Sequence, residues 1–347
     1  METRITQSFG LSYPIVLSGM SWISLPRLVA AVSQAGGLGI LATGVLNAEQ
    51  TRRAVREVRT LTDRPFGANV TLYFPGARDN ARVLLEEHVP VINFSMGKGD
   101  WITAQAHAYG GKTIATVTTV RHAVSAAEYG TDALLVTGHE AAAHGSEVTS
   151  MVLIPSIADA VSIPLIAAGG FADGRGLAAA LALGADAVAM GTRLMSTRES
   201  PVHQRCKTFA VEKDAQDTVY SSRFDGQLCR VMKSRGSARA IRRGLDLKRA
   251  FFSSREIAAM LGVNHLKLTI SVLASGWKNV RQLAHLANAF KAFRLATTEG
   301  DDERGVLPLG QATALVRDIP TVAELFQRIV AEAERAGARV ATATAVA

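Results

Sequence analysis

Two histidines are the side chains of this sequence best suited to move a proton. His139 and His144 follow an apolar run and lie on a polar stretch. An imidazole titrates near neutral pH, so either histidine is a candidate general base. A histidine on a loop is more often simply solvated, and that alternative stays open for both. A phosphate-binding site nearby would favour His144.

The segment from Pro164 to Thr192 repeats one pattern twice. An apolar run over Leu165–Ala168 ends at Gly169-Gly170, and a second run over Ala187–Met190 ends at Gly191-Thr192. Backbone N–H groups at such strand ends are free to face a phosphate. A single glycine turn is most simply a short connection, but two consecutive turns favour a phosphate site.

The elements that must position these residues alternate regularly over the first 200 positions. Eight short apolar runs predict buried parallel strands, separated by helical patterns. The expected strands are Pro14–Ser18, Leu38–Ala42, Phe66–Val70, Val91–Ser95, Thr113–Thr118, Ala133–Thr137, Leu165–Ala168 and Ala187–Met190. The alternation predicts an α/β fold of the (β/α)8 TIM-barrel type. An open doubly wound sheet is the alternative, but its glycine fingerprint is missing after the first strand, where Gly19-Met20-Ser21-Trp22 stands.

Active sites of such barrels lie at the carboxyl ends of the strands, which selects a set of candidates. These are Met20, Asn69, Met96, Thr116, Thr118, Thr137, His139, His144, Gly169, Gly170, Gly191 and Thr192. The set is nearly free of carboxylates, so no metal site is predicted. The reactivity must then come from an organic cofactor held by its phosphate. Asn69 suits a hydrogen bond to a flat polar ring or a loop cap, and Met20 suits packing under that ring or core filling.

The alternation stops near Arg205. Helical patterns follow at Glu256–Leu261, Leu266–Leu273 and Val280–Phe290, with no apolar run typical of a strand between them. We therefore expect a barrel over residues 1–204, a smaller helical insert domain over 205–305, and a return segment over 306–347. The return segment ends in a helix, Val322–Ala336, which is expected to pack on the barrel.

Composition limits the possible partners and compartments. Residues 205–305 contain 19 Lys and Arg against 10 Asp and Glu, so they carry the whole excess of positive charge in a chain of net charge +8. This favours an anionic cofactor or nucleotide-bearing substrate, although solubility alone is an alternative. No base-stacking or zinc motif accompanies the charge, so nucleic acid is not expected. Two cysteines, no apolar run of membrane-spanning length and no signal peptide favour a cytoplasmic protein.

Several motifs together resemble the nitronate monooxygenase family, also called 2-nitropropane dioxygenases. The FMN-phosphate signature of that family is similar to Gly169–Gly176 followed by Met190–Arg193. Further similar stretches follow in the family's order: Ser18–Met20, Ala35–Gly39, Pro65–Asn69 and Glu140–Gly145. The family shares its layout with flavin-dependent enoyl reductases and NAD(P)H:quinone reductases. It includes reductases of CoA thioesters from steroid-ring breakdown, which resemble this chain around Arg223–Gly226 and Arg230.

The resemblance implies an FMN-dependent oxidoreductase with His144 as the catalytic base. The implied cofactor contacts are Gly19, Met20, Asn69, Thr116, Thr137, Gly138, Ala168, Gly169, Gly170, Met190, Gly191 and Thr192. The implied reaction oxidises nitronates or nitroalkanes with dioxygen to a carbonyl compound and nitrite. The alternative is NAD(P)H-dependent reduction of an enoyl-CoA, acyl-CoA or quinone. Ala142 and Ala143 replace glycines common in the family, and their Cβ atoms are expected to crowd the flavin or shift the loop.

Overall fold

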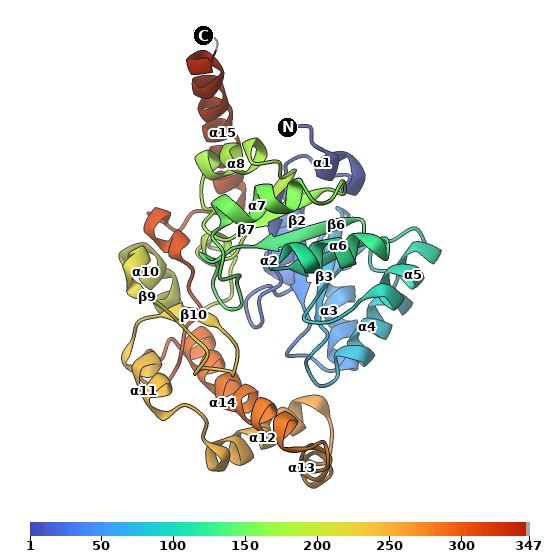
Figure 1. The fold of residues 1–347 in the computed structure, drawn as a ribbon, viewed down its shortest axis with the longest axis vertical. Helices are drawn as coiled ribbons and strands as arrows, with labels where there is room; N and C mark the ends of the chain where they lie inside the picture. The colour runs from blue at the N-terminus through green and yellow to red at the C-terminus, as the bar shows by residue number, and fades with distance from the viewer. Residues whose placement is uncertain (345–347) are drawn as a thin grey trace.

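The barrel predicted from the sequence is confirmed. The computed structural model describes residues 1–344, with all side chains except those of residues 260 and 261. Eight parallel strands form a closed barrel in sequence order, and β8 pairs with β1 through Ile15 and Val188 (Figure 1). The strands are β1 Ile15–Leu17, β2 Leu38–Ala42, β3 Phe66–Thr71, β4 Val91–Ser95, β5 Lys112–Val117, β6 Ala133–Thr137, β7 Leu165–Ala168 and β8 Ala187–Met190. Each end lies within one residue of its predicted position.

Helices follow the strands and cover the outside of the barrel. They are α2 Pro26–Gln34, α3 Ala48–Leu61, α4 Ala77–Glu86, α5 Asp100–Ala108, α6 Val120–Glu128, α7 Ser150–Ala158 and α8 Gly174–Ala182. The helix α1 Arg4–Phe9 precedes β1, and its Ile5 and Phe9 pack with the apolar side chains inside the barrel, such as Ile40 and Ile166. The short helix α9 Thr192–Met195 begins directly after β8.

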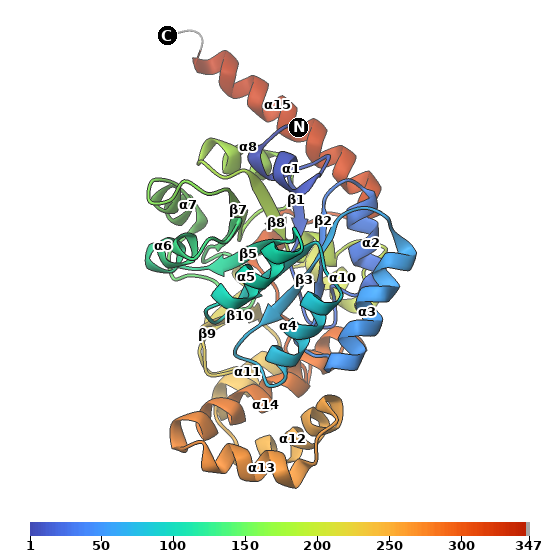
Figure 2. The same cartoon turned by 90° about the vertical axis from the view of Figure 1, so that its right-hand side faces the viewer.

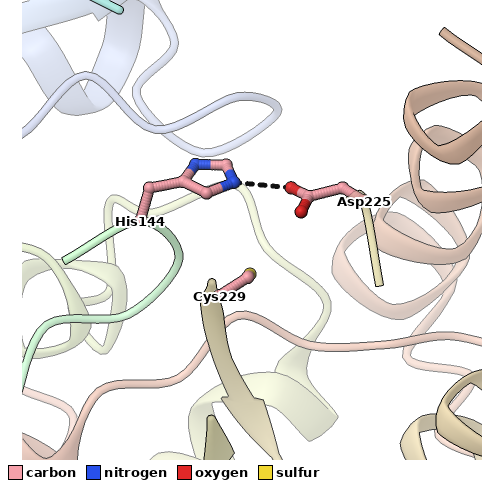
Figure 3. Close-up of side chains that lie close together, drawn as sticks. All are labelled: His144, Asp225 and Cys229. Atoms are coloured by element: carbon pink, nitrogen blue, oxygen red, sulfur yellow. Dashed lines mark hydrogen bonds and ion pairs between the residues drawn. The ribbon is translucent and has the colours of Figure 1, made fainter. Parts of the chain in front are cut away.

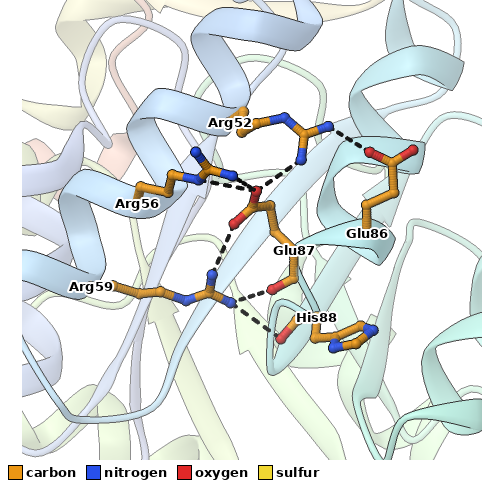
Figure 4. A network of polar contacts seen from close by, with 6 residues as sticks. All are labelled: Arg52, Arg56, Arg59, Glu86, Glu87 and His88. Atoms are coloured by element: carbon orange, nitrogen blue, oxygen red, sulfur yellow. Dashed lines mark hydrogen bonds and ion pairs between the residues drawn. The ribbon is translucent and has the colours of Figure 1, made fainter.

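Helices α3 and α4 are joined on the outer face by an ion-pair network. The carboxylate of Glu87 accepts hydrogen bonds from Arg52, Arg56 and Arg59 (Figure 4). The pKa of Glu87 lies below its ordinary value, and the hydrogen bond from Arg56 is the largest cause. This network is remote from the strand ends that form the site, so we assign it to stability of the barrel wall.

The segment after the barrel is mainly helical, as expected, but it also contains two short strands that the sequence did not predict. Strands β9 Thr218–Ser221 and β10 Cys229–Met232 form a two-stranded antiparallel sheet. Each is only four residues long and mixes polar with apolar side chains, which leaves almost no periodic signal. The other elements are α10 Gln204–Glu212, η1 Ala215–Asp217, α11 Arg235–Arg243, α12 Leu247–Leu261, α13 His265–Ala274, α14 Trp277–Glu299 and η2 Gln311–Leu315.

The chain returns to the barrel through α15 Val322–Thr344, which packs against α8 (Figure 2). The close approach depends on Gly174, because a Cβ there would lie 2.2 Å from the carbonyl oxygen of Ile329. Helices α11 to α14 of the insert gather on one side of the barrel, as both views show (Figures 1 and 2). Within residues 1–344, no helix has the length and apolar character needed to cross a membrane.

Candidate active site

A large cavity opens at the carboxyl ends of the barrel strands. Its volume is about 1260 Å³, and both the barrel and the insert contribute to its walls. The predicted residues that line it are Gly19, Met20, Asn69, Met96, Thr116, Thr118, Thr137, His144, Ala168, Gly169, Gly170, Gly191 and Thr192. Gly138 and Met190 lie outside this lining, and the side chain of Met190 is fully buried in the core. Their contact with a cofactor stays a prediction.

The two glycine turns form a cradle of backbone donors. Gly169 and Gly170 adopt φ values of 101° and 87°, a left-handed conformation that favours glycine. In the described part of the chain, the backbone N–H groups of Gly170, Gly191 and Thr192 have no hydrogen-bond acceptor. A Cβ at Gly191 would meet only the Met20 sulfur, at 3.5 Å, so the space in front of this turn is open. Unpaired N–H groups facing open space fit a phosphate.

The amino terminus of α7 is not part of this cradle. The carboxylate of Glu140 accepts hydrogen bonds from the backbone N–H and the hydroxyl of Ser150, both at 2.9 Å. The same hydroxyl lies 2.8 Å from the carbonyl oxygen of Gly169. Ser150 and Glu140 therefore fix the first glycine turn and occupy the helix end with a carboxylate. The sequence did not single out Ser150, which starts a helix and carries no motif.

Neutral amides and hydroxyls continue the cavity wall from β3 to β5. The Asn69 side chain donates to Asn93 Oδ1 at 2.7 Å, and Asn93 donates to Thr116 Oγ1 at 3.0 Å. Gly19 lets the first loop approach this row, because a Cβ there would lie 2.4 Å from the Asn69 Cβ. The chain of hydrogen bonds fixes the orientation of Asn69. Asn93 was missed because a polar residue inside a strand gives no sign of the face to which it points.

Of the two candidate histidines, His144 is the one that lines the cavity. Its Nε2 lies 2.6 Å from Asp225 Oδ2, on the loop between β9 and β10 (Figure 3). A carboxylate only accepts hydrogen bonds, so Nε2 carries the proton and Nδ1 of the neutral ring is left as an acceptor. His139, the other candidate, lies outside the cavity lining, and its ring packs against Tyr220.

The environment of His144 sets its protonation. Burial by itself would lower the pKa of His144, but the hydrogen bond to Asp225 and the charge of its carboxylate act in the other direction. The pKa of His144 is therefore raised above its ordinary value. Asp225 is almost completely buried. The sequence suggested only that the stretch around Asp225 resembles CoA-thioester reductases, and it gave no reason to pair Asp225 with His144.

Cys229 lies beside this pair at the start of β10 (Figure 3). The potential ligand atoms of His144, Asp225 and Cys229 all lie within 4.8 Å of one another. Full burial raises the pKa of the Cys229 thiol well above its ordinary value. The sulfur is therefore protonated at neutral pH in the metal-free protein. We assign Cys229 to packing beneath the pair.

Arg230 fixes the loop that carries His144. Its guanidinium donates to the carbonyl oxygen of His139 at 3.0 and 3.1 Å and to Thr218 Oγ1 at 3.0 Å. The backbones of Arg230 and Ala143 exchange two hydrogen bonds, at 3.0 and 2.9 Å. Ala143 has a φ of 53°, in the left-handed region. The insert thus holds the loop at His139 and Ala143, the stretch that leads to His144.

The helix α14 supplies an apolar wall to the cavity. The lining residues from this helix include Leu286, Ala289, Phe290 and Phe293. The ring of Phe290 packs edge-on against Trp22, with the ring centroids 4.9 Å apart. Trp22 comes from the loop after β1, so this contact joins the insert to the barrel across the cavity. The sequence predicted a helix here but gave no reason to place it against the site.

Known proteins resemble this chain over nearly its whole length. The sequence model of the family described as "Nitronate monooxygenase" matches residues 2–83 and 74–332. A (3aS,4S,5R,7aS)-5-hydroxy-7a-methyl-1-oxo-octahydro-1H-indene-4-carboxyl-CoA dehydrogenase of Rhodococcus jostii is 37% identical over 96% of both chains. A probable nitronate monooxygenase of Staphylococcus aureus is 31% identical and covers 67% of this chain and 79% of its own length. The solved structure of FabK from Thermotoga maritima covers 99% of both chains at 34% identity, with a TM-score of 0.81.

Proposed function

The chain belongs to the nitronate monooxygenase family of oxidoreductases, and we propose that it is an FMN-dependent enzyme acting on an alicyclic carboxyl-CoA thioester. The observation that carries this proposal is one cavity that combines a phosphate cradle, a fixed imidazole and a long apolar wall. Small-molecule pockets usually measure about 300–1000 Å³. A cavity of about 1260 Å³ has room for a cofactor and a bulky substrate together.

The residues present fit FMN. The phosphate would be held by the N–H groups of Gly170, Gly191 and Thr192, which lack acceptors within the described chain. The ring system would lie along Met20 and Asn69, where neutral donors and acceptors line the cavity. When bound, FMN supplies the hydride chemistry that no side chain here can provide.

His144 would move the proton. The carbon next to a thioester carbonyl is acidified by that carbonyl, and Nδ1 is the free acceptor of the neutral ring. Asp225 accepts the hydrogen bond from Nε2–H and stabilises the charge that the ring gains on protonation. In the reverse, reductive direction, the protonated ring would return the proton, which the raised pKa of His144 favours.

The apolar wall favours a thioester with a large acyl group over a small nitro compound. Leu286, Phe290 and Phe293 would contact a hydrocarbon ring system, whereas nitroalkanes are too small to need them. The relatives from Rhodococcus jostii and Mycobacterium tuberculosis, at 37% and 33% identity, are named for a bicyclic carboxyl-CoA. Their full-length similarity supports the same class of substrate for this chain.

Nitronate oxidation is the second candidate. The family description and the Staphylococcus aureus relative support it. With a neutral nitroalkane, the same Nδ1 of His144 would take the proton next to the nitro group, whereas a nitronate has already lost that proton. Dioxygen would be the electron acceptor that yields a carbonyl compound and nitrite. A quinone or enoyl-CoA reduced at the expense of NAD(P)H is the remaining alternative within the family resemblance.

An anaerobic reduction panel tests the proposal. The FMN-loaded protein would be mixed with cyclohexanecarboxyl-CoA, propane-2-nitronate, NADH or NADPH, and the flavin absorbance band followed. We expect bleaching by the saturated thioester in wild type and its loss in His144→Ala, with the FMN content unchanged. Bleaching by the nitronate alone would replace the thioester assignment by the second candidate. A protein that binds no added FMN would overturn both.

A further inference from the structure

A second cavity lies in the insert, on a different face of α14. Its volume is about 620 Å³. The main cavity is lined by Phe290 and Phe293, whereas Lys291 and Leu295 line the second one. Successive residues of a helix point about 100° apart, so α14 separates the two cavities. The remaining walls come from α11, the first two turns of α12, and the turn that precedes the return segment.

The lining of this second cavity is strongly basic. The cationic residues are Arg239, Arg243, Lys248, Arg249, Lys291 and Arg304, and the acidic ones are Asp246 and Glu303. Three of the cations have carboxylate partners: Arg239 pairs with Glu303 of the lining itself, while Lys291 pairs with Glu256 and Arg304 with Asp301, both outside the lining. The other three cations, Arg243, Lys248 and Arg249, face only one further lining carboxylate, that of Asp246, so the cavity keeps a net positive charge.

The other three cations have no partner. Within residues 1–344, the side chains of Arg243, Lys248 and Arg249 form no ion pair or hydrogen bond with the protein. The Nε of Arg249 is buried without any acceptor. Burial, and then the neighbouring charge of Arg243, lower the pKa of Arg249, with only Asp246 opposing them. Arg243 and Lys248 are exposed to solvent, so the cost lies in the buried Nε of Arg249 and in the nearness of its guanidinium to that of Arg243, and a bound anion would relieve both.

The size and one aromatic side chain narrow the class of anion. A cavity of about 620 Å³ is larger than one phosphate and lies in the range of small-molecule sites. Phe252 lines it and is 53% exposed; the Arg255 guanidinium lies over one face of its ring, 5.9 Å from the centroid, so a base would stack on the other face. We propose that this cavity binds an adenosine phosphate, with its phosphates against Arg243, Lys248 and Arg249 and its base on Phe252. The ligand is either a free nucleotide or the nucleotide end of a CoA thioester.

Binding of adenosine 3′,5′-bisphosphate to the FMN-loaded protein tests the site, because FMN keeps the main phosphate cradle filled. We expect saturable binding by titration calorimetry that weakens as salt is added. Arg243→Ala should weaken it at least about tenfold, which is about 1.4 kcal/mol. The matched control is Arg242→Ala, because Arg242 occupies the same last turn of α11 and lies outside the cavity. Its affinity should stay within about twofold of wild type.

Two further arms identify the source of the nucleotide. If the CoA tail binds here, Arg243→Ala raises the KM for an acyl-CoA and leaves that of the matching N-acetylcysteamine thioester unchanged. If a free nucleotide binds here, neither KM changes while bisphosphate binding is lost. Absence of binding in wild type, or equal loss in Arg242→Ala and Arg243→Ala, would overturn the proposal. Since the readout is binding, it does not depend on which compound reduces the flavin.

Discussion

The bond between His144 and Asp225 joins residues 81 positions apart and from different parts of the fold. Barrel and insert each supply one member of the pair. The carboxylate orients the ring, selects its tautomer and raises the pKa of His144 against the opposing effect of burial. We therefore assign Asp225 as the positioning residue of the site.

Replacement of Asp225 tests this role through pH dependence. Only the neutral imidazole accepts a proton, so the rate of proton abstraction falls as pH drops through the pKa of His144. The raised pKa places this fall above the ordinary value of 6.5. In Asp225→Asn only burial still shifts the pKa of His144, and burial lowers it, so the fall in rate should move to lower pH. The maximum of kcat/KM should drop about 10- to 100-fold.

The measurement is kcat/KM between pH 5 and 9 for wild type, Asp225→Asn and Asp225→Glu. Asp225→Glu keeps the charge and should retain a raised inflection. An inflection at the same pH in Asp225→Asn and wild type would show that Asp225 does not control the protonation of His144.

Alanine substitutions at Gly191 and Gly169 are expected to have different effects: the first should weaken FMN binding, and the second should lower the stability of the fold. Gly191 has a φ of −93°, which any residue adopts, and its missing Cβ would project into open space. Gly191→Ala should leave the melting temperature of the FMN-free protein nearly unchanged and weaken FMN binding at least about tenfold by crowding the phosphate. Flavin fluorescence titration and thermal denaturation measure the two quantities.

Gly169→Ala is the contrasting variant. Its φ of 101° and the 3.0 Å approach of a Cβ to the Ser150 hydroxyl predict a loss of about 1–2 kcal/mol in the free energy of unfolding. Unimpaired FMN binding by Gly191→Ala would place the phosphate away from this turn.

Among the elements, β10 does the most to shape the site. It carries Arg230, lies next to Asp225 in the chain, and pairs with the loop before His144 through Ala143. Neither β9 nor β10 was predicted. Their residues pair with each other, and Arg230 and Tyr220 contact the barrel loop; both are tertiary interactions that four-residue patterns cannot reveal.

Arg230→Met should destabilise this element. It leaves the His139 carbonyl oxygen without its guanidinium donors, at a cost of about 2–3 kcal/mol in the free energy of unfolding. Urea denaturation measures the loss. Hydrogen exchange should become faster in residues 139–147, while the strands β1 to β5 keep their protection. Unchanged exchange in this loop would mean that β10 does not hold it.

At the scale of the whole molecule, the packing of the last helix, α15, against α8 depends on the close contact at Gly174. Gly174→Ala would force α15 away from α8, because its Cβ meets Ile329 and Ala333 backbone atoms at 2.2 and 2.3 Å. We expect a loss of about 1–3 kcal/mol in the free energy of unfolding. The matched control is Gly337→Ala in α15, where a Cβ meets nothing within 4 Å and should stabilise the helix by up to about 1 kcal/mol. Equal unfolding midpoints would contradict the packing of α15.

The barrel was predictable because each of its strands is marked by the residues of that strand and of the turns beside it. Runs such as Leu38–Ala42 and Ala187–Met190 are short, apolar and bounded by turns, and the glycine turns stand in the sequence itself. The contacts of Asp225, Asn93 and Phe290 were not predictable, because each depends on tertiary packing between distant segments. The family resemblance suggested FMN as the cofactor and His144 as the base. The structure added Asp225 as the partner of His144 and the apolar wall from α14.

Hydrogen exchange at the substrate carbon tests the central claim most directly, because it isolates the proton step from electron transfer. Cyclohexanecarboxyl-CoA would be incubated anaerobically in D₂O with FMN-loaded protein, and the proton next to the thioester carbonyl followed by NMR. The account predicts exchange in wild type, slower exchange in Asp225→Asn, and none above background in His144→Ala. Exchange at the wild-type rate in His144→Ala would contradict it.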